Sequence, residues 1–527
     1  MRQNRYCYYV TTSIPYVNAR PHIGHALEFV QADVLARYHR LRGEDTRFLT
    51  GTDDNALKNV RAAEAEGLAT QALVDRNAAH FAALRQPLDL SFDDFIRTSG
   101  EARHADGVRK LWRACDRAGD LYKRAYRGLY CVGCEQFYTE AELADGRCPI
   151  HRTRPELVEE ENYFFRLSRY AAEILTLIES GALRIIPETR RNEVLGFVRR
   201  GLEDFSVSRS QARARGWGVP VPGDARQVMY VWFDALGNYI TALDYATDGA
   251  LYRRYWRQNP NRVHVIGKDI LRFHAVYWPA MLLSAGEPPP STIYVHEFLT
   301  VAGEKMSKSL GNVVDPTAIA ARFGTDPTRY WLLREMPRTE DGDFTLTRLI
   351  DRYNRDLAND LGNLLNRTVS MVWRYRDGVI PAPVRREGHE GALLRQIAAR
   401  VPSETEAALD QFDFRTALMG IWGLVTAANR YVEESAPWVL ATRAKDGDGA
   451  AAQRLDTVLY HLAESLRLIA FHLTPYLPAA AVQIARQIGV EDHGVYDEAV
   501  TWGHLVPGVA VSEPRPLFPR IESTTSE

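Results

Sequence analysis

The sequence predicts an α/β protein with a parallel sheet, interrupted by a cysteine-rich insertion and followed by a bundle of long helices. Three observations lead to this prediction. A strand, helix and strand pattern fills residues 6–51, three cysteines crowd into residues 131–148, and apolar residues at helical spacing dominate residues 349–488. At 527 residues, the chain is long enough for about three or four domains.

The first pattern opens with aromatic and β-branched residues at 6–14, which are typical of a strand buried on both faces. Helical spacing follows from His22 to Leu41, and Gly43 ends that helix. Residues 47–51 are a second apolar strand. A helix between two such strands is a βαβ unit, so we expect a parallel sheet.

The cysteine-rich segment at 126–151 differs in character from both of its flanks, and we interpret it as an insertion. Strand patterns resume at 228–232 and 262–266, so we expect the insertion to divide the sheet. The helical end has breaks at 378–391 and 445–449, and its spacing is exemplified by Leu462, Leu466, Ile469 and Leu473. This pattern predicts a helical bundle.

Composition excludes some classes of protein. With 46% hydrophobic and 25% charged residues, the chain is neither disordered nor fibrous. A net charge of −2 provides no overall positive field, so a polyanion would have to bind local clusters. No apolar run is long enough to span a bilayer and no secretory cleavage site is evident, so we expect a cytoplasmic protein without a membrane segment.

Lysine is scarce, with 7 Lys among the 65 Lys and Arg residues. Each remaining lysine is therefore a candidate for a role that needs a compact, mobile ammonium group. These lysines are Lys58, Lys110, Lys123, Lys268, Lys305, Lys308 and Lys445.

The segment Pro21-His22-Ile23-Gly24-His25 lies where the first strand leads into the first helix. Backbone N–H groups and the positive end of the helix dipole favour a phosphate there, and Gly24 permits close approach. His22 and His25 are three residues apart and can donate to an anion from one face. Taken alone, such a pair is more often a capping or packing pair.

A second segment, Gly303 to Asn312, carries Lys305 and Lys308 between glycines. This composition suits a loop that closes over a polyphosphate, although a solvated charged loop is the simpler reading of the segment by itself. The chain has no Walker-type phosphate loop, so ATP would have to be bound in another way.

Together, His-Ile-Gly-His and the later Lys-Met-Ser-Lys-Ser resemble the two signatures of class I aminoacyl-tRNA synthetases. The neighbouring residues resemble the methionyl-tRNA synthetase family from about residue 6 to 520. The resemblance implies a Rossmann-like catalytic domain, split by a connective insertion with a zinc knuckle, and an all-α anticodon-binding bundle. The expected boundaries are 1–116 and 226–300 for the two catalytic halves, 117–225 for the insertion, 301–350 for the Lys-Met-Ser-Lys-Ser loop and stem-contact region, and 351–527 for the anticodon domain.

By this resemblance, the activity is ATP-dependent formation of methionyl-adenylate from L-methionine, followed by transfer to the terminal adenosine of tRNA(Met). Charge on the ATP phosphates would be stabilised by four catalytic residues, His22, His25, Lys305 and Lys308. The expected ATP-binding residues are Gly24, Glu28, Gly267, Asp269 and Lys308. Magnesium should accompany the nucleotide.

The spacing Cys131-x-x-Cys134-x13-Cys148-x-x-His151 supplies four ligands for tetrahedral zinc. A complete set of three cysteines and one histidine leaves no open position, so we expect one structural zinc ion per chain rather than a catalytic one. The resemblance places this site in the family's connective insertion.

Methionine has an apolar, polarisable side chain, so its pocket should be aromatic and apolar. Taken alone, each candidate is more readily interpreted as a core residue, and the set fits a pocket better than its members do. The positions that match the family's pocket wall are Ile14, Tyr16, Trp232, Ala235, Leu236, Tyr239, Ile270 and His274.

Asp53 follows the second strand, at the edge where open α/β sheets bind ligands, and it resembles the family residue that holds the substrate ammonium. Arg209 occupies the place of the arginine that pairs with it. One departure is that Asn55-Ala56 stands where the family usually has His-Gly, which could alter the loop or the accepted substrate.

In the helical end, the resemblance assigns anticodon recognition to Asn363, Arg367 and Trp438, with Ser435 as the N-cap of a helix. We expect a monomer, because no oligonucleotide-binding barrel follows the bundle. Two alternatives stay open: a divergent paralogue, used in resistance or biosynthesis, with another amino acid or acceptor, and a non-catalytic tRNA-binding protein.

Overall fold

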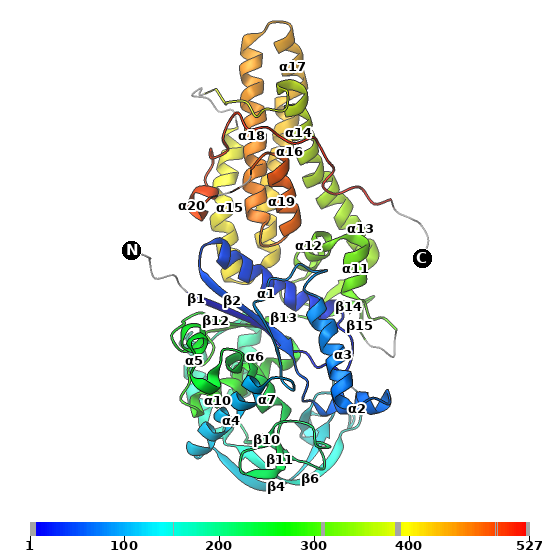
Figure 1. Ribbon diagram of the computed structural model, residues 1–527, viewed down its shortest axis with the longest axis vertical. Helices are drawn as coiled ribbons and strands as arrows, with labels where there is room; N and C mark the ends of the chain where they lie inside the picture. The colour runs from blue at the N-terminus through cyan, green and yellow to red at the C-terminus, as the bar shows by residue number, and fades with distance from the viewer. Residues whose placement is uncertain are drawn as a thin grey trace. The chain divides into compact units, whose positions relative to one another are not determined.

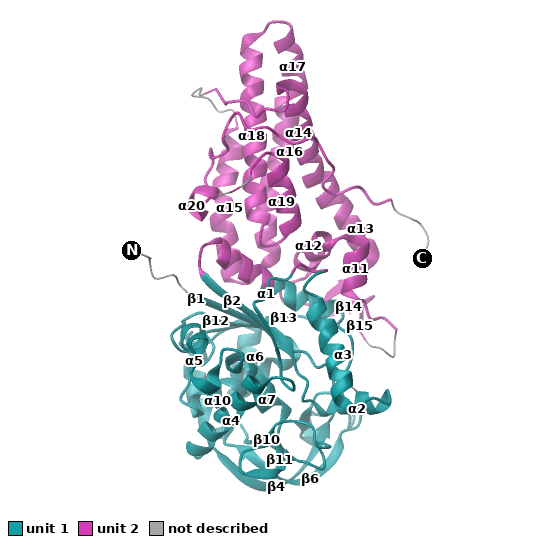
Figure 2. Cartoon of the chain, viewed as in Figure 1, with its two compact units in different colours: residues 1–32, 45–86, 90–297 teal, residues 33–44, 87–89, 298–527 magenta. Residues whose placement is uncertain are grey.

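The computed structural model describes residues 7–150, 152–306, 311–384, 391–490, 492 and 494–522. Contacts within the chain divide it into two compact units, coloured in Figure 2. Unit 1 comprises residues 1–32, 45–86 and 90–297, and unit 2 comprises residues 33–44, 87–89 and 298–527. Over the described ranges, every helix is too short or too polar to cross a bilayer.

Unit 1 is built on a six-stranded parallel sheet with the strand order β3-β2-β1-β12-β13-β7. The strands are β1 (Cys7–Thr12), β2 (Asp45–Thr52), β3 (Asp94–Arg97), β7 (Arg184–Ile186), β12 (Arg262–Gly267) and β13 (Thr292–His296). Helix α1 (Ile23–Leu41) connects β1 to β2. The predicted βαβ unit and parallel sheet are therefore confirmed.

Strand β1 pairs with β2 on one side and with β12 on the other, so the direction of winding changes at β1. Because the strands are parallel, the segments after β1, β2, β12 and β13 all leave the sheet at its carboxyl edge. Ligands bind at such a switch point in open α/β sheets. The predicted site segments follow these four strands.

Other helices of unit 1 pack around this sheet, with a core that includes Tyr9, Trp112, Tyr239, Trp256 and Trp278. These helices are α2 (Leu57–Ala65), α3 (Thr70–Ala83), α4 (Ala102–Arg117), α5 (Ala171–Glu179), α6 (Glu188–Arg199), α7 (Val231–Leu236), α8 (Asn238–Thr241), α9 (Ala250–Tyr252) and α10 (Trp278–Ser284).

Two sequence-based expectations about the sheet were wrong in detail. Residues 228–232 do not form a strand of the parallel sheet, because β11 (Asp224–Met229) pairs with β10 (Pro220–Val221) and β9 (Ser208–Ser210) instead. Val231 and Trp232 open helix α7. In addition, β7 lies within the segment 117–225 that we assigned to the insertion, yet it is an edge strand of the parallel sheet.

The insertion itself contains a four-stranded antiparallel sheet of order β5-β4-β6-β8. Its strands are β4 (Leu121–Cys131), β5 (Gln136–Tyr138), β6 (Glu156–Phe165) and β8 (Phe205–Ser206). Cys131 ends β4, and Cys134 lies in the turn before β5, so the hairpin brings the cysteines together.

Unit 2 begins with a small sheet of order β15-β14-β16, formed by β14 (Leu299–Val301), β15 (Glu304–Lys305) and β16 (Gly342–Phe344). Its long helices lie alongside one another in Figure 1. The helices are α11 (Pro316–Phe323), α12 (Thr325–Glu335), α13 (Leu346–Arg352), α14 (Asn363–Arg376), α15 (Ala392–Asp410), α16 (Phe414–Ser435), α17 (Pro437–Lys445), α18 (Gly449–Leu473), α19 (Pro478–Gln487) and α20 (Tyr496–Ala499).

The predicted bundle is confirmed, and the helix ends agree with the predicted breaks. Helix α14 ends at Arg376 and α15 begins at Ala392, while α17 ends at Lys445 and α18 begins at Gly449. The residues that indicated helical spacing, Leu462, Leu466, Ile469 and Leu473, are all fully buried on α18. This helix packs against α16, α17 and α19 and forms the centre of the bundle.

Candidate active site

The rings of the two histidines after β1 are in contact, with centroids 3.8 Å apart and an angle of 34° between their planes. The backbone N–H of His22 donates to Nδ1 of His25 over 3.1 Å, and the N–H of Gly24 donates to Nδ1 of His22 over 3.1 Å. In a neutral imidazole, an Nδ1 that accepts leaves the proton on Nε2. Both rings are therefore held as neutral donors at the start of α1.

His25 is kept neutral by its surroundings. Burial lowers the pKa of His25 well below its ordinary value, and the nearby His22, His296 and Lys58 lower this pKa further. Its ring also contacts the Phe81 ring edge-on, with centroids 5.1 Å apart. A neutral donor can stabilise charge that develops on a phosphate without carrying a permanent charge of its own.

Glu28, one turn further along α1, is fully engaged by neighbours. One carboxylate oxygen accepts from the Ser13 N–H over 2.7 Å and from its hydroxyl over 2.6 Å, while the other lies 2.9 Å from Nε2 of His296. Nδ1 of His296 faces the Glu297 carbonyl at 2.9 Å. Both ring nitrogens of His296 face acceptors, which favours the protonated form. Burial lowers the pKa of His296, but hydrogen bonding to Glu28 prevails and raises it.

Gly267 and Asp269 lie beside this pair, at the end of β12. A Cβ atom at Gly267 would come within 3.1 Å of an Asp269 carboxylate oxygen and 3.6 Å of the His296 ring. A side chain at this position would therefore crowd Asp269. Asp269 is exposed, so its carboxylate can meet a ligand from solvent. Sequence reasoning missed His296, since nothing in the local pattern marks it.

Four of the eight residues predicted to form an apolar pocket, Tyr16, Trp232, Tyr239 and His274, belong to one aromatic cluster. Trp232 stacks on Phe273 with centroids 3.8 Å apart and 5° between the planes, and Tyr16 meets Trp232 edge-on at 6.3 Å. Trp232, Leu236 and Tyr239 belong to the buried core, while Ile14, Tyr16 and Ile270 pack against it and remain half-buried. Ala235 and His274 are buried at 4% and 2% exposure, respectively.

His274 is a neutral member of this cluster. Its Nδ1 lies 2.9 Å from the Ile270 carbonyl and must donate to it, so Nε2 accepts from the Tyr239 hydroxyl over 2.7 Å. Burial lowers the pKa of His274 to about 4.

The neutral state of His274 leads to a prediction about stability. Between pH 4 and pH 6.5 the unfolded chain binds a proton that the folded chain does not, so the free energy of unfolding falls as the pH is lowered through this range, by up to about 3 kcal/mol from this group. We expect His274→Gln to show a shallower fall in melting temperature between pH 6.5 and 4 than the unmodified chain. Equal slopes would contradict a buried, neutral His274.

Asp53 lies beside Tyr16, and the main chains of the two residues form a parallel bridge. The Asp53 side chain is 2% exposed. Burial raises the pKa of Asp53 well above its ordinary value, and Asp234, Asp54 and Glu135 raise it further. A cation bound here would lower the pKa of Asp53 again, because an opposite charge favours the ionised carboxylate.

Arg209, on β9, does not pair with Asp53 as the resemblance implied. Within the described residues, its one ion pair is with Glu135, at 3.7 Å. Its guanidinium lies over the rings of Tyr130 and Tyr230, at 4.2 and 4.5 Å from their centroids. Its terminal nitrogens are buried and make no hydrogen bond within the described part of the chain. The aromatic faces and Glu135 therefore hold the Arg209 cation.

Asn55 and Ala56, which stand where the family usually has His-Gly, fit the fold without backbone strain. The Asn55 amide donates to Asp234 of α7 over 2.6 Å and to the Thr98 carbonyl over 3.2 Å. Asp234 also bonds to His104, at 2.9 Å. Ala56 has a φ of −77°, a conformation that needs no glycine. Asn55 thus ties the Asp53 loop to the helix that carries Trp232.

The three cysteines form a compact cluster, with their sulfur atoms all within 4.8 Å of one another. Two thiolates on a tetrahedral zinc ion lie about 3.8 Å apart, given Zn–S bonds of about 2.3 Å. The Cys134 and Cys148 sulfurs are 3.4 Å apart, and the Tyr138 hydroxyl donates to Cys134 over 3.1 Å. The cluster is compatible with zinc. His151, the fourth predicted ligand, lies outside the described residues.

The lysine segment is described only in part. Lys308 lies outside the described residues, and Lys305 is described only as the end of β15. The structure therefore leaves the predicted meeting of the histidines with these lysines untested.

In unit 2, two of the three predicted anticodon residues are adjacent. The Arg367 guanidinium pairs with Glu433 at 2.7 Å and lies 5.9 Å from the centroid of the Trp438 ring. Trp438 is 42% exposed, so its ring is available for stacking. Asn363 is exposed on the same helix as Arg367, one turn earlier. Ser435 is not an N-cap: it ends α16, and its hydroxyl donates to the Tyr431 carbonyl instead of accepting from the next helix.

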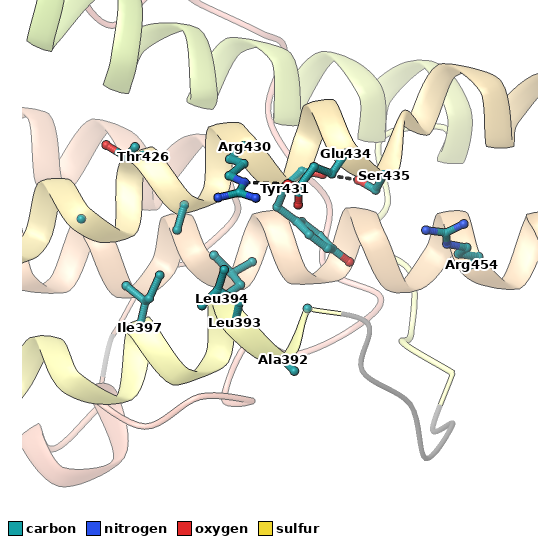
Figure 3. Close-up of a pocket in the computed structure, with 13 residues that line it drawn as sticks. Ala392, Leu393, Leu394, Ile397, Thr426, Arg430, Tyr431, Glu434, Ser435 and Arg454 are labelled. Atoms are coloured by element: carbon teal, nitrogen blue, oxygen red, sulfur yellow. Dashed lines mark hydrogen bonds and ion pairs between the residues drawn. The ribbon is translucent and has the colours of Figure 1, made fainter.

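A separate cavity of about 660 Å³ lies between α15 and α16 (Figure 3). Its wall includes Leu393, Ile397, Thr426 and an Arg430–Glu434 ion pair of 2.6 Å. None of the predicted anticodon residues is among the residues described as lining it.

A parallel sheet whose predicted site segments follow its strands at the switch point, joined to a helical bundle, is the architecture expected of a class I aminoacyl-tRNA synthetase, and the comparisons agree. Residues 8–153 and 139–369 match the family model "tRNA synthetases class I (M)", and residues 380–527 match "Anticodon binding domain of methionyl tRNA ligase". The chain belongs to the methionyl-tRNA synthetase family.

Individual relatives are similar over nearly the whole chain. The methionine–tRNA ligase of Caldanaerobacter subterraneus subsp. tengcongensis is 44% identical, over 98% of this chain and 79% of the relative. That of Mycobacterium bovis is 44% identical, over 98% of each chain. A solved structure, the methionyl-tRNA synthetase of Mycobacterium tuberculosis in complex with methionyl-adenylate, has a TM-score of 0.93 at 43% identity and covers 98% of this chain and 100% of its own.

Proposed function

We propose that the chain is an ATP-dependent methionine–tRNA ligase, which forms methionyl-adenylate and transfers methionine to the 3′ adenosine of tRNA(Met). The observation that carries this proposal is the arrangement in unit 1. Neutral His22 and His25 follow β1, Asp53 follows β2, and Asp53 bridges to Tyr16 of the aromatic cluster. Those groups suit a triphosphate, an α-ammonium group and a thioether side chain, respectively.

In the first step, the methionine carboxylate attacks the α-phosphate of ATP, and the bond to the leaving pyrophosphate breaks. No proton has to move, so the protein contributes positioning and charge stabilisation. The Nε2–H groups of His22 and His25 donate to phosphate oxygens. We propose that Lys305 and Lys308 supply positive charge to the same phosphates, and that Gly24, Glu28, Gly267 and Asp269 bind the rest of the nucleotide.

The amino-acid site is the set of residues around Asp53. The Asp53 carboxylate binds the methionine ammonium. Arg209 pairs with Glu135 and so offsets the negative charge of this neighbouring acid. The methionine side chain lies among the aromatic residues, where a buried thioether makes favourable contacts with ring edges. Tyr239 and His274 satisfy each other's polar atoms, so this wall of the pocket presents an apolar surface to the substrate.

Two metal ions are part of the proposal. Cys131, Cys134 and Cys148, with His151 as the fourth ligand, would hold one zinc ion that stabilises the fold of the insertion. Magnesium would bind with ATP and neutralise phosphate charge. We also propose a monomeric, cytoplasmic enzyme, which sedimentation of the purified chain and cell fractionation would test.

The alternatives differ in a measurable way. ATP–pyrophosphate exchange should be strictly dependent on methionine when all twenty amino acids are assayed singly, in the presence of magnesium. Preference for another amino acid would favour the divergent paralogue, because Asn55-Ala56 lies beside the pocket. Absence of exchange with every amino acid would favour the non-catalytic tRNA-binding protein.

Trp438 provides a test of the RNA-binding role. Stacking of a base on an aromatic ring contributes about 1–3 kcal/mol, so Trp438→Ala should raise the KM for tRNA by about tenfold to a hundredfold. Exchange in the absence of tRNA should stay within about twofold of the unmodified chain, because the ring takes no part in adenylate formation. An unchanged KM for tRNA would contradict stacking on Trp438. Trp373→Ala, at a 47% exposed tryptophan of α14, is the matched control.

A further inference from the structure

Glu135, the residue after Cys134, is a buried acid that none of the roles above uses. It is 1% exposed, and its backbone φ is 55°, a left-handed conformation rarely adopted by residues other than glycine, Asn and Asp. Burial of a carboxylate is unfavourable unless partners compensate for lost water. Its partners therefore indicate why it is there.

One partner is the start of helix α2. The N-cap residue of this helix is Ala56, whose side chain cannot accept a hydrogen bond, and no side-chain cap is present there. An oxygen of Glu135 accepts from the Lys58 N–H over 2.8 Å. Glu135 thus caps the helix from 77 positions later in the chain, and its charge also complements the helix dipole.

The side chain of Lys58 also contacts the turn that precedes Glu135. Its ammonium group donates to the Gly133 carbonyl, in the Cys131–Cys134 turn, over 3.1 Å. The same ammonium lies 4.0 Å from the centroid of the Tyr16 ring. Lys58 is thereby bound to the cysteine turn on one side and to the wall of the amino-acid pocket on the other.

The second oxygen of Glu135 faces the other half of the amino-acid site. It accepts from the Tyr130 hydroxyl and lies 3.7 Å from the Arg209 guanidinium. The Glu135 backbone carbonyl also accepts from the hydroxyl of Tyr230, the residue before α7. One buried residue therefore contacts α2, β4, β9 and the segment that leads into α7.

We propose that Glu135, acting with Lys58, is a positioning residue that couples the cysteine cluster to the methionine site. The two residues fix the start of α2, and hence the Asp53 loop that precedes it, relative to Arg209 and Tyr16. A metal ion in the cysteine cluster would hold the turn that carries Gly133 and Glu135, and its loss would then loosen the amino-acid site more than the nucleotide site. This inference rests on the proposed function.

The test compares KM values in ATP–pyrophosphate exchange. Loss of a buried, charged partner from a well-packed site weakens binding by about tenfold or more. We expect Glu135→Ala to raise the KM for methionine by about tenfold or more, and the KM for ATP by about twofold at most. Glu135→Gln keeps an acceptor for the Lys58 N–H and should fall between the unmodified chain and Glu135→Ala. Zinc content, measured by atomic absorption, should stay at the unmodified level in both variants.

A matched control and a second variant keep the test decisive. Glu140→Ala, at an exposed acid of the same insertion, should leave both KM values unchanged. If Glu135→Ala does not fold, Lys58→Met takes its place, since it removes the ammonium contact and keeps the N–H. Chelation of zinc from the unmodified enzyme should raise the KM for methionine. Chelation of zinc from the Glu135→Ala variant should raise this KM little further, because the effects of coupled sites are not additive.

Equal increases in the KM for methionine and for ATP, or a KM for methionine within twofold of normal in a folded variant, would overturn the proposal. Failure of the proposed function is distinguishable from this result, because it would be seen as an absence of methionine-dependent exchange in the unmodified chain.

Discussion

Replacement of Asp53 by Asn should raise the KM for methionine by about 10²–10³-fold, because removing one partner of a buried charge pair costs about 2–5 kcal/mol. Asp53 is 2% exposed, and its pKa is raised by burial and by Asp234, Asp54 and Glu135, so its site is short of positive charge. In the proposed complex, the methionine ammonium would supply that charge. The measurement is the dependence of ATP–pyrophosphate exchange on methionine concentration.

The control for Asp53→Asn is Asp116→Asn, an exposed acid on α4, which should leave the KM for methionine unaltered. The KM for ATP should change little in either variant, since Asp53 does not face the phosphates. If Asp53→Asn bound methionine with normal affinity, the ammonium group would have to be held elsewhere.

Replacement of His25 by Ala should slow adenylate formation by about 10²–10³-fold, the effect typical of removing one donor to charge that develops in the transition state. Methionine binding at equilibrium should be unchanged. The structure gives the physical reason: a backbone N–H holds Nδ1, which leaves Nε2–H as the donor, and burial keeps the ring neutral. Single-turnover kinetics of adenylate formation would measure the rate constant directly.

The low pKa of His25 has a consequence for the pH profile. Because the ring is already neutral well below pH 6.5, its protonation should not reduce the rate as the pH falls from 8 to 6. His504→Ala, at an exposed histidine, is the control for loss of an imidazole. A His25→Ala variant that formed adenylate at the normal rate would exclude a role for this ring in charge stabilisation.

Much of the fold could be predicted from the sequence because local signals and long-range packing agree there. Apolar and β-branched runs marked β1 and β2, and helical spacing marked α1. Gly43, with a φ of 79°, ends that helix as glycine commonly does. The pattern failed at Val231 and Trp232. Apolar β-branched and aromatic residues indicate a strand locally, but here they begin a buried helix, and short apolar runs do not distinguish the two.

The candidate site was predictable where a residue type has few other uses. The cysteine spacing led directly to a cluster, which the structure contains. Scarcity of lysine singled out Lys58, but its contacts with Gly133 and Tyr16 join segments far apart in the chain, and spacing could not reveal them. Glu135 gave no signal at all, because burial of an acid depends on partners from three separate elements.

Charging of tRNA tests the central claim most directly. Purified chain, ATP, magnesium, unfractionated tRNA and labelled methionine should yield label esterified to methionine-accepting tRNA alone, at a rate that falls with Asp53→Asn. Formation of adenylate without any transfer to tRNA, or transfer of a different amino acid in preference to methionine, would contradict the assignment.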